Sequence, residues 1–365
     1  MQQQPERRGQ PQFHTSHDVS RTQRKRRRAR RFMLASVGVL VTILAVFGGA
    51  LGAAFGTSWG SHWRLLAAET VASTRHYEWA RFLTTRAEYA QIMKGLSGIA
   101  VRQSSPNDVV VDKIQKIDAG NSGPVQVIPL HQDGYTGDVV LVPDPKLVRL
   151  VPAEVHGSTG EYITSMAQRV GAVAGINASG FEDPNGNGWG GIPVGLEYVG
   201  GQVMQSSKET PSWATVGFTS EGVMVMGNYT PSDLAAIGVR DAMQFHPELV
   251  VDGQPMITQG DGGWGLDPRT AIGQERDGTV IFVVINGRLH GDHSIGASMK
   301  QVMDIMLQYH AVNACAMDGG SSSVLYAEGK ILNSPSTLDP NGQRHLPDAW
   351  MVFPTEQAAA DANLS

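Results

Sequence analysis

The segment richest in reactive groups is DGGSSS (318–323), which lies between the apolar runs 312–317 and 324–326. A carboxylate, Asp318, follows a predicted strand, and two flexible glycines and three hydroxyls come after it. Successive backbone N–H groups in such a turn can bind an anion, and the aspartate can act as an acid, a base or an orienting group. A tight turn in which Asp318 accepts backbone N–H bonds explains the segment equally well.

Further polar segments end or flank other predicted strands. Arg269, in PRTAIG, has a guanidinium fork suited to a phosphate, although a surface salt bridge is the commoner use of an arginine. Asn177 ends an apolar run and can bind sugar hydroxyls or phosphate oxygens, or cap a turn. The Asn-Gly pair at 286–287 is a turn signal, with Arg288 directly after it. Polar loops of this kind can converge on one site when a rigid scaffold carries them.

The loop at 183–188 begins like a calcium-binding loop. Asp183, Asn185 and Asn187 alternate and a glycine follows, as in the D-x-N-x-N-G opening of such loops. Val194 stands where the closing bidentate acid would be, which favours an ordinary Asn/Gly-rich loop. A structural calcium ion is therefore the weaker interpretation. No nucleotide or redox cofactor is expected, since no matching motif is present.

Short strand-like runs separated by Gly, Pro and Asp must position these groups. Helical patterns cover 158–170 and 294–309, and Ser294 or Ser298 can cap the second helix. The predicted fold class is α+β: a sheet-rich mixed domain with a few helices, preceded by a transmembrane helix and a helical stem. The strand-like runs are 125–130, 139–142, 172–176, 223–226, 248–251 and 280–285.

The N-terminal part predicts a membrane anchor. Residues 32–55 carry no charge, and as a helix they would span about 36 Å, more than a hydrocarbon core of about 30 Å. Residues 1–31 carry a net charge of +8, with a basic cluster at 24–31. The positive-inside rule then predicts a single-pass protein of the cell membrane, with a cytoplasmic N-terminus and an extracellular C-terminal domain. A cleaved signal peptide is the alternative, which the long basic region and long apolar run disfavour.

A helical stem is expected at 62–97, where apolar residues recur at spacings of three and four. It either docks on the main domain or spaces it from the bilayer, and self-association of stems is the alternative. The predicted organisation is a basic cytoplasmic tail (1–31), a transmembrane helix (32–55), the stem (62–97), the main domain (109–354) and a C-terminal tail (355–365).

Composition and missing motifs exclude several classes of protein. The chain has no G-x-x-x-x-G-K-[ST], no G-x-S-x-G and no H-E-x-x-H, which argues against a P-loop enzyme, an ordinary α/β-hydrolase and a zincin. The residues beyond the basic tail carry a net charge of −13, so a nucleic-acid partner is not expected. The single cysteine, Cys315, lies in an apolar run and is expected to be a buried small hydrophobe.

Taken in order, these segments resemble the phosphodiester glycosidase family. The family includes the lysosomal uncovering enzyme, which removes N-acetylglucosamine from mannose-6-phosphate diesters, and bacterial proteins described as exopolysaccharide-related. The resemblance covers roughly 109–354, and PRTAIG and DGGSSS are its most specific parts. The matching stretches are AVAGINASGF (172–181), GIPVGLEYVGGQV (191–203), PRTAIG (268–273), NGR (286–288), 294–326 and GKILNSPS (329–336).

The resemblance implies which residues form the site. The family's polar site positions fall on Asn177, Arg269, Asp318, Gly319, Gly320 and Ser321, while Arg288 and Arg344 match further arginines. The family often has Asp where this chain has Asn286, so no acid or base role is expected there.

The resemblance also implies hydrolysis of a sugar-1-phosphodiester in a cell-surface glycopolymer, with N-acetylglucosamine as the first candidate sugar. A leaving phosphate needs little protonation, so one carboxylate and a cationic clamp can suffice where ordinary glycosidases use two carboxyl groups. Arg269 would bind the phosphate, Asp318 would supply acid/base chemistry or activate water, and Asn177 with the Gly319 and Gly320 amides would position the substrate. Candidates for a second carboxylate are Glu182, Asp183, Glu197 and Asp261.

Two alternatives remain open from the sequence. A non-catalytic surface protein could bind the same polymer, although the acidic balance disfavours purely electrostatic binding of a phosphate-rich chain. A glycosyl-phosphate transferase could use a polymer hydroxyl in place of water with the same residues.

Overall fold

The computed structural model describes residues 17–74, 76–97, 101–106, 109–111, 123–155, 157, 159–183, 188–206, 213–287 and 294–364. The described chain divides into two compact units, Met1–Arg64 and Leu65–Ser365. The first unit is helical, and the second contains the sheets. The predicted α+β class, with an apolar N-terminal helix before a sheet-rich domain, is confirmed.

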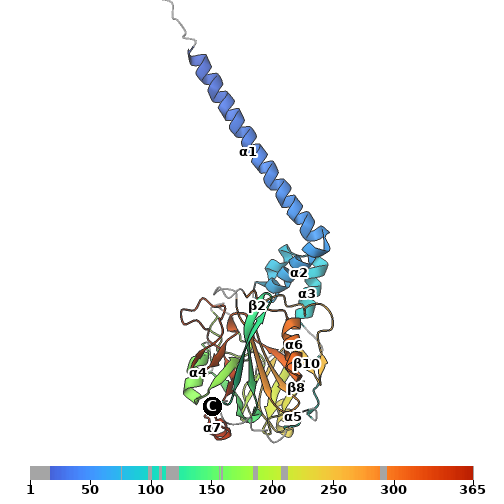
Figure 1. The fold of residues 1–365 in the computed structure, drawn as a ribbon, viewed down its shortest axis with the longest axis vertical. Coiled ribbons are helices and arrows are strands. Elements are labelled where there is room, and N and C mark those ends of the chain that lie inside the picture. Colours follow the sequence, from blue (N-terminus) through green and yellow to red (C-terminus); the bar gives the residue numbers. More distant parts are fainter. Residues whose placement is uncertain are drawn as a thin grey trace, which may run out of the picture. The chain divides into compact units, whose positions relative to one another are not determined.

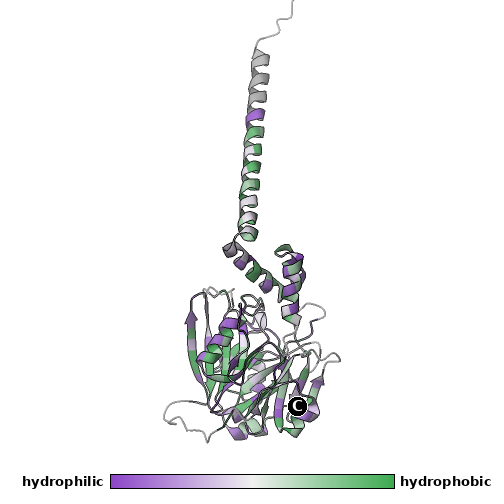
Figure 2. Cartoon of the chain, turned by 90° about the vertical axis from the view of Figure 1, so that its right-hand side faces the viewer, coloured by the Kyte–Doolittle hydropathy of each residue, from purple (hydrophilic) through white to green (hydrophobic). Residues whose placement is uncertain are grey.

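The first unit is dominated by α1 (His17–Gly56). Its 27-residue segment Arg30–Gly56 is long and apolar enough to cross a membrane, a test that a signal sequence also passes. Large apolar side chains along it, such as Phe32 and Phe47, are exposed, and the ribbon in Figure 2 is largely green and white there. None of the most apolar window of this segment is buried within the structure. Contacts with the rest of the unit are found at its C-terminal end, where the Arg64 guanidinium lies 4.2 Å from the centre of the Phe55 ring.

The stem is helical, as the spacing of its apolar residues predicts. It consists of α2 (Ser58–Ala72), the 3-10 helix η1 (Tyr77–Phe82) and α3 (Arg86–Ser97). Within the second unit, Ala68, Ala72, Ala80 and Ile92 form a small buried cluster of their own. The stem residues from Leu65 onward thus pack on each other as well as on the sheet domain.

Three antiparallel sheets form the main domain (Figure 1). In the largest, the neighbouring strands are β1 (Gln126–Gln132), β2 (Tyr135–Val142), β13 (Val280–Ile285), β12 (Arg269–Glu275), β14 (Ala311–Met317), β10 (Glu248–Val251) and β11 (Gln254–Pro255). The second contains β16 (Lys330–Ile331), β15 (Leu325–Ala327), β4 (Ala174–Asn177), β17 (Asp348–Val352) and β3 (Val148–Pro152). The third contains β6 (Gln202–Ser206), β5 (Leu196–Val199), β9 (Val239–Phe245), β7 (Ala214–Thr219) and β8 (Met224–Gly227).

Strands with two buried faces read as continuous apolar runs. β13, with the sequence VIFVVI, is buried along its whole length because β2 and β12 flank it and further layers cover it. The predicted runs 248–251 and 280–285 coincide with β10 and β13. The buried thiol of Cys315 lies in β14, where burial raises its pKa well above the ordinary value.

A few short helices cover the sheets. They are α4 (Ile163–Val170), α5 (Pro231–Ala236), α6 (Met299–Gln308), α7 (Glu356–Asp361) and the 3-10 helices η3 (Pro145–Leu147) and η4 (Gly320–Ser322). Of the two serines offered as caps for α6, Ser298 is the one used: its hydroxyl accepts from Gln301 N, and the Gln301 side chain accepts from Ser298 N. The predicted methionine face, including Met303 and Met306, is buried.

Candidate active site

Asp318 lies where two sheets meet. It directly follows β14, and its backbone N donates to the carbonyl oxygen of Ala178, just beyond β4, at 3.0 Å. The side chain is half-buried, and its Oδ1 accepts from Gly319 N at 3.0 Å. Burial raises the pKa of Asp318 above the ordinary aspartate value, and the neighbouring carboxylate of Asp267 acts in the same direction. The Ser322 hydroxyl, the Arg344 guanidinium and the Gly319 amide offset only part of this rise.

Asn177 fixes the backbone of Asp318 through its side chain. Its side chain is fully buried at the end of β4. Nδ2 donates to Asp318 O at 2.7 Å, while Oδ1 accepts from the Thr270 hydroxyl at 2.7 Å and from Val324 N at 3.1 Å. The side chain therefore ties together three chain segments, and it does not line the cavity.

Arg269 lies beside Asp318 because β12 and β14 are antiparallel neighbours, with Thr270 paired to Met317. The side chain is only 3% exposed. Its Nε donates to Ala297 O at 3.1 Å, and its Nη2 donates to Trp264 O at 2.8 Å and Gly265 O at 3.0 Å. The Nε and Nη2 groups of the guanidinium are thus bonded to backbone carbonyls, although the residue also lines the cavity.

The predicted glycine amides are already engaged. Gly319 N donates to the carboxylate of Asp318, and Gly320 N donates to Pro268 O at 2.9 Å. Gly320 has φ +60°, a conformation that glycine adopts without strain. Gly319, Gly320 and Ser321 do line the cavity, with the backbone of the turn forming its floor.

Arg344 is placed to contact a ligand. It is half-buried, its Nη1 donates to the Ser321 hydroxyl at 2.7 Å, and its guanidinium lies 4.5 Å from the centre of the Phe181 ring. Gly188, at φ +73°, leaves room for it, because an ideal Cβ there would lie 2.7 Å from Arg344 Nη2. Since Ser321 accepts from the arginine, its own hydroxyl hydrogen can point to a ligand.

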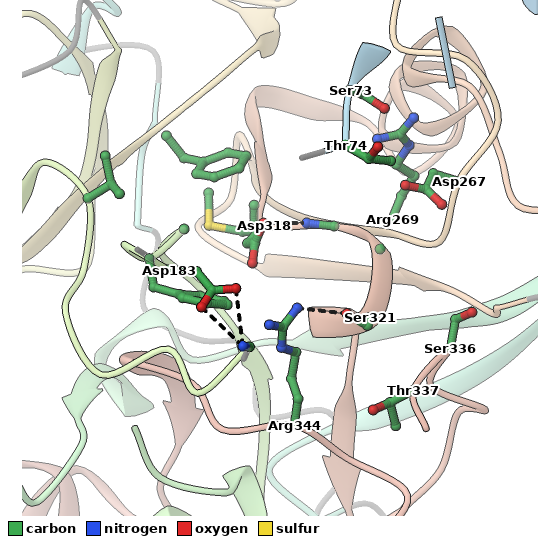
Figure 3. Close-up of a pocket in the computed structure, with 18 of the residues that line it drawn as sticks. Ser73, Thr74, Asp183, Asp267, Arg269, Asp318, Ser321, Ser336, Thr337 and Arg344 are labelled. Carbon is green, nitrogen blue, oxygen red and sulfur yellow. Dashed lines mark hydrogen bonds between the residues drawn. The ribbon is translucent and has the colours of Figure 1, made fainter. Parts of the chain in front are cut away.

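These residues surround a cavity of about 840 Å³ (Figure 3). An aromatic group lines one part of it: Trp213 stacks on His246 with ring centres 4.5 Å apart, and the rings of Trp264 and His246 lie at 72° with centres 5.0 Å apart. Burial lowers the pKa of His246 to about 4, so its imidazole is neutral at pH 7. Ser73 and Thr74, at the end of the stem helix α2, also line the cavity.

The remaining predicted residues fall in different places. Asp183 lines the cavity and both its carboxylate oxygens accept from Gly188 N at 3.1 Å, the backbone-bonded arrangement of an ordinary loop. Asn185, Asn187 and Arg288 lie outside the described residues. In the part of the chain that the structure describes, no group of three or more His, Cys, Asp or Glu side chains could hold a metal ion, so a calcium ion stays a prediction.

The four candidates for a second carboxylate are separated by the fold. Asp183 alone of the four lines the cavity. Glu197 is fully buried beside Asp348, whose pKa is raised well above the ordinary value by burial and by Glu197. Asp261 faces Glu69 of the stem and, with burial, raises the pKa of Glu69 to about 7.

Comparison with known proteins places the chain in a family. The phosphodiester glycosidase family model matches residues 170–353, half of the chain, a span that includes β4, Arg269, Asp318 and Arg344. The chain belongs to the phosphodiester glycosidase family. The matched span begins after the apolar helix α1, the stem and strands β1 to β3.

Two known proteins are similar to this chain. The SPbeta prophage-derived uncharacterized protein YomE of Bacillus subtilis (strain 168) is 32% identical over 184 residues, which cover 48% of this chain and 27% of that protein. The chain thus spans about a quarter of the length of that curated relative. The catalytic domain of zebrafish N-acetylglucosamine-1-phosphodiester alpha-N-acetylglucosaminidase, solved in a form auto-inhibited by its pro-peptide, matches with a TM-score of 0.54 and 16% identity, covering 70% of this chain and 88% of that one. At that identity the likeness concerns the fold alone.

Sequence reasoning missed several residues of this phosphodiester glycosidase cavity. Asp267 immediately precedes PRTAIG, so its place next to Arg269 could have been noticed. His246, Trp213 and Trp264 lie outside the recognised motifs, in loops that only the tertiary fold brings together. Ser73 belongs to the stem, and no motif in the sequence connects the stem with the site.

Proposed function

We propose that this protein hydrolyses a sugar-1-phosphodiester in a glycopolymer, with N-acetylglucosamine as the first candidate sugar. The observation that carries the proposal is the arrangement around Asp318. A carboxylate with a raised pKa shares a cavity with the Arg344 guanidinium and the Ser321 hydroxyl, which together offer donors to a phosphate. Membership of the phosphodiester glycosidase family supports the same reaction class.

In this proposal Asp318 activates water. Burial makes its carboxylate a stronger base than an exposed aspartate, which suits removal of a proton from an attacking water molecule. The departing phosphate is a weak base and needs no strong general acid. Asn177 positions Asp318 through its bond to the Asp318 carbonyl, at 2.7 Å.

The phosphate is assigned to Arg344 in place of Arg269. Arg344 contacts the Ser321 hydroxyl and the Phe181 ring, both of which a ligand can approach from the cavity. Arg269 is bonded through Nε and Nη2 to three backbone carbonyls, so its main contribution is to hold the walls in place. Trp213, which also lines the cavity, offers a flat apolar face to the C–H face of a sugar ring.

The proposed place of action is the outer face of the cell membrane. The apolar segment Arg30–Gly56 and the basic cluster before it support a retained anchor with the C-terminal domain outside. Protease added to intact cells is expected to digest the domain. Protection of the domain together with a cytoplasmic marker would contradict this orientation, and a secreted domain that begins near Ala53 would indicate a cleaved signal.

The experiment that tests the function uses the purified full chain in detergent. It is expected to release free sugar from the methyl diester of N-acetylglucosamine-1-phosphate and to leave the methyl glycoside of the same sugar intact, because Arg344 would then face an empty subsite. Binding of the polymer without release of sugar would support the binding-protein alternative. Transfer of the sugar phosphate to an added polymer hydroxyl would support the transferase.

A further inference from the structure

The cavity is larger than a sugar phosphate requires, and the stem supplies part of its wall. Its volume of about 840 Å³ is near the upper end of the roughly 300–1,000 Å³ of pockets that enclose a drug-sized ligand. Ser73 and Thr74 line it together with Trp264 and Asp267. In the view of Figure 3, Arg344 is drawn apart from the cluster of Ser73, Thr74, Arg269 and Asp267, so one ligand could contact both parts of the lining.

The stem is fixed to the loop that carries Trp264. Leu266 N donates to Thr70 Oγ1 at 3.0 Å. Gly265 has φ +62°, and an ideal Cβ there would lie 2.2 Å from Thr70 Oγ1, so the close approach of the stem requires glycine at this position. Arg269 donates to Gly265 O at 3.0 Å. The loop is therefore held by the stem and by the buried site arginine.

The hydroxyls that the stem presents act as acceptors. Ser73 Oγ donates its hydrogen to Thr70 O at 3.0 Å, and Thr74 Oγ1 donates its hydrogen to Val71 O at 2.8 Å. A hydroxyl has one hydrogen and two lone pairs, so what these side chains have left for a ligand is acceptor capacity. Thr74 Oγ1 already accepts from His76 N at 3.1 Å, which leaves it one lone pair. The Asp267 carboxylate is an acceptor as well. These acceptors suit a group that donates hydrogen bonds.

We propose that Ser73, Thr74, Trp264 and Asp267 form a subsite, here called the stem subsite, for a neutral polyhydroxy unit on the far side of the substrate's phosphate. Sugar or polyol hydroxyls donate to the acceptors, and the indole face of Trp264 covers apolar C–H groups. The inference rests on the proposed function, because the stem subsite would bind the group that stays attached to the phosphate after the sugar is released. It makes the stem a part of the substrate site as well as a connection to the anchor.

The test compares two substrates of the full chain in detergent. One is the methyl diester of N-acetylglucosamine-1-phosphate, and in the other a hexose replaces the methyl group. In Thr74→Trp the indole fills the stem subsite, so the preference for the hexosyl diester, measured as the ratio of the two kcat/KM values, should fall about tenfold. Gln91→Trp, at an exposed position of α3 away from the cavity, is the matched control and should keep the ratio.

A second measurement does not depend on turnover. Cys315 is buried, so Ser73→Cys introduces an accessible thiol at the subsite. The hexosyl diester should slow alkylation of that thiol more than the methyl diester does. The stem subsite would be overturned if Thr74→Trp left the ratio of the two kcat/KM values unchanged, lowered both kcat/KM values equally, or raised kcat/KM for the hexosyl diester. Equal rates of thiol alkylation in the presence of the two diesters would overturn it as well. If the parent cleaves neither diester but the hexosyl diester alone protects the thiol, the proposed function fails and the stem subsite stands.

Discussion

Two walls of the cavity differ in what they offer a ligand. The wall at Arg344 and Ser321 offers hydrogen-bond donors, because the guanidinium carries only donors and the serine accepts from it. The wall at Ser73 and Thr74 offers acceptors, because both hydroxyl hydrogens are donated to backbone carbonyls of the stem. One wall therefore suits an anion and the other suits hydroxyl groups. A phosphodiester with a sugar-like arm presents both.

The two arginines of the cavity also differ, in their burial and in their contacts. Arg269 and Arg344 both line the cavity, yet one is 3% exposed and bonded to backbone carbonyls, while the other is half-buried and contacts side chains. An arginine with its N–H groups on carbonyls stabilises a loop, whereas one beside a hydroxyl and a ring contacts groups that a ligand in the cavity can also reach. Substituting each in turn separates these uses.

The largest effect on stability is expected for Arg269→Ala. It removes the guanidinium donor from the carbonyls of Trp264, Gly265 and Ala297, of which Ala297 O keeps only the long bond from Asp267 N at 3.3 Å. The loss should cost on the order of 3 kcal/mol and lower the melting temperature by about 10 °C. Arg276→Ala, at an exposed turn, is the matched control and should leave the melting temperature unchanged. Calorimetry of the two variants checks this. If Arg269→Ala keeps the wild-type melting temperature and loses only affinity for the diester, the phosphate is bound by Arg269.

A large effect on activity with little effect on folding is expected for Arg344→Ala. Loss of the donors to the phosphate should lower kcat/KM on the methyl diester by about 100-fold. Arg344→Lys keeps the charge but loses the planar fork and the contact with the Phe181 ring, so it should recover only part of the activity. Steady-state kinetics and melting curves of the three proteins measure this. Loss of activity that merely follows loss of fold would contradict the assignment.

The smallest effect concerns pH and the stem wall. Burial and the carboxylate of Asp261 raise the pKa of Glu69 from 4.5 to about 7 when the stem is docked. A raised pKa in the docked state means that docking is most favourable below about pH 4.5 and weakens as the pH rises through 7. Hydrogen exchange of amides 65–97, corrected for the intrinsic pH dependence, should show less protection at pH 8 than at pH 5.

The control for that prediction is Glu69→Gln, in which the protection of the stem should vary little between these two pH values. A local measurement is needed because burial also raises the pKa of Glu248 to about 7, and that residue contributes its own pH dependence to global stability. Equal protection of the wild-type stem at both pH values would contradict the docking of Glu69 against Asp261.

The strands and helices could be predicted from local sequence patterns, whereas the roles of the site residues depend on the tertiary fold. The runs that became β10 and β13 and the capped helix α6 were predictable because apolar period, strand length and capping chemistry are local properties. Asp318 could be named as a site residue because a carboxylate after a buried strand is visible in the sequence. The engagement of Arg269 was not predictable, since Ala297 comes from a loop 28 residues further along the chain. The share of the stem in the cavity depends on the contact of Thr70 with Leu266, which are 196 residues apart.

Asp318 is the central residue of the proposed mechanism. Its role is tested most directly by turnover of the methyl diester of N-acetylglucosamine-1-phosphate by the full chain and by Asp318→Asn. The substitution preserves the shape of the side chain and removes its basicity, so kcat should fall by at least about 100-fold while KM changes little. Asp304→Asn, at a half-exposed acid of α6 paired with Lys300, is the matched control and should keep wild-type turnover. Wild-type turnover by Asp318→Asn, on a diester that the parent cleaves, would contradict the proposed mechanism.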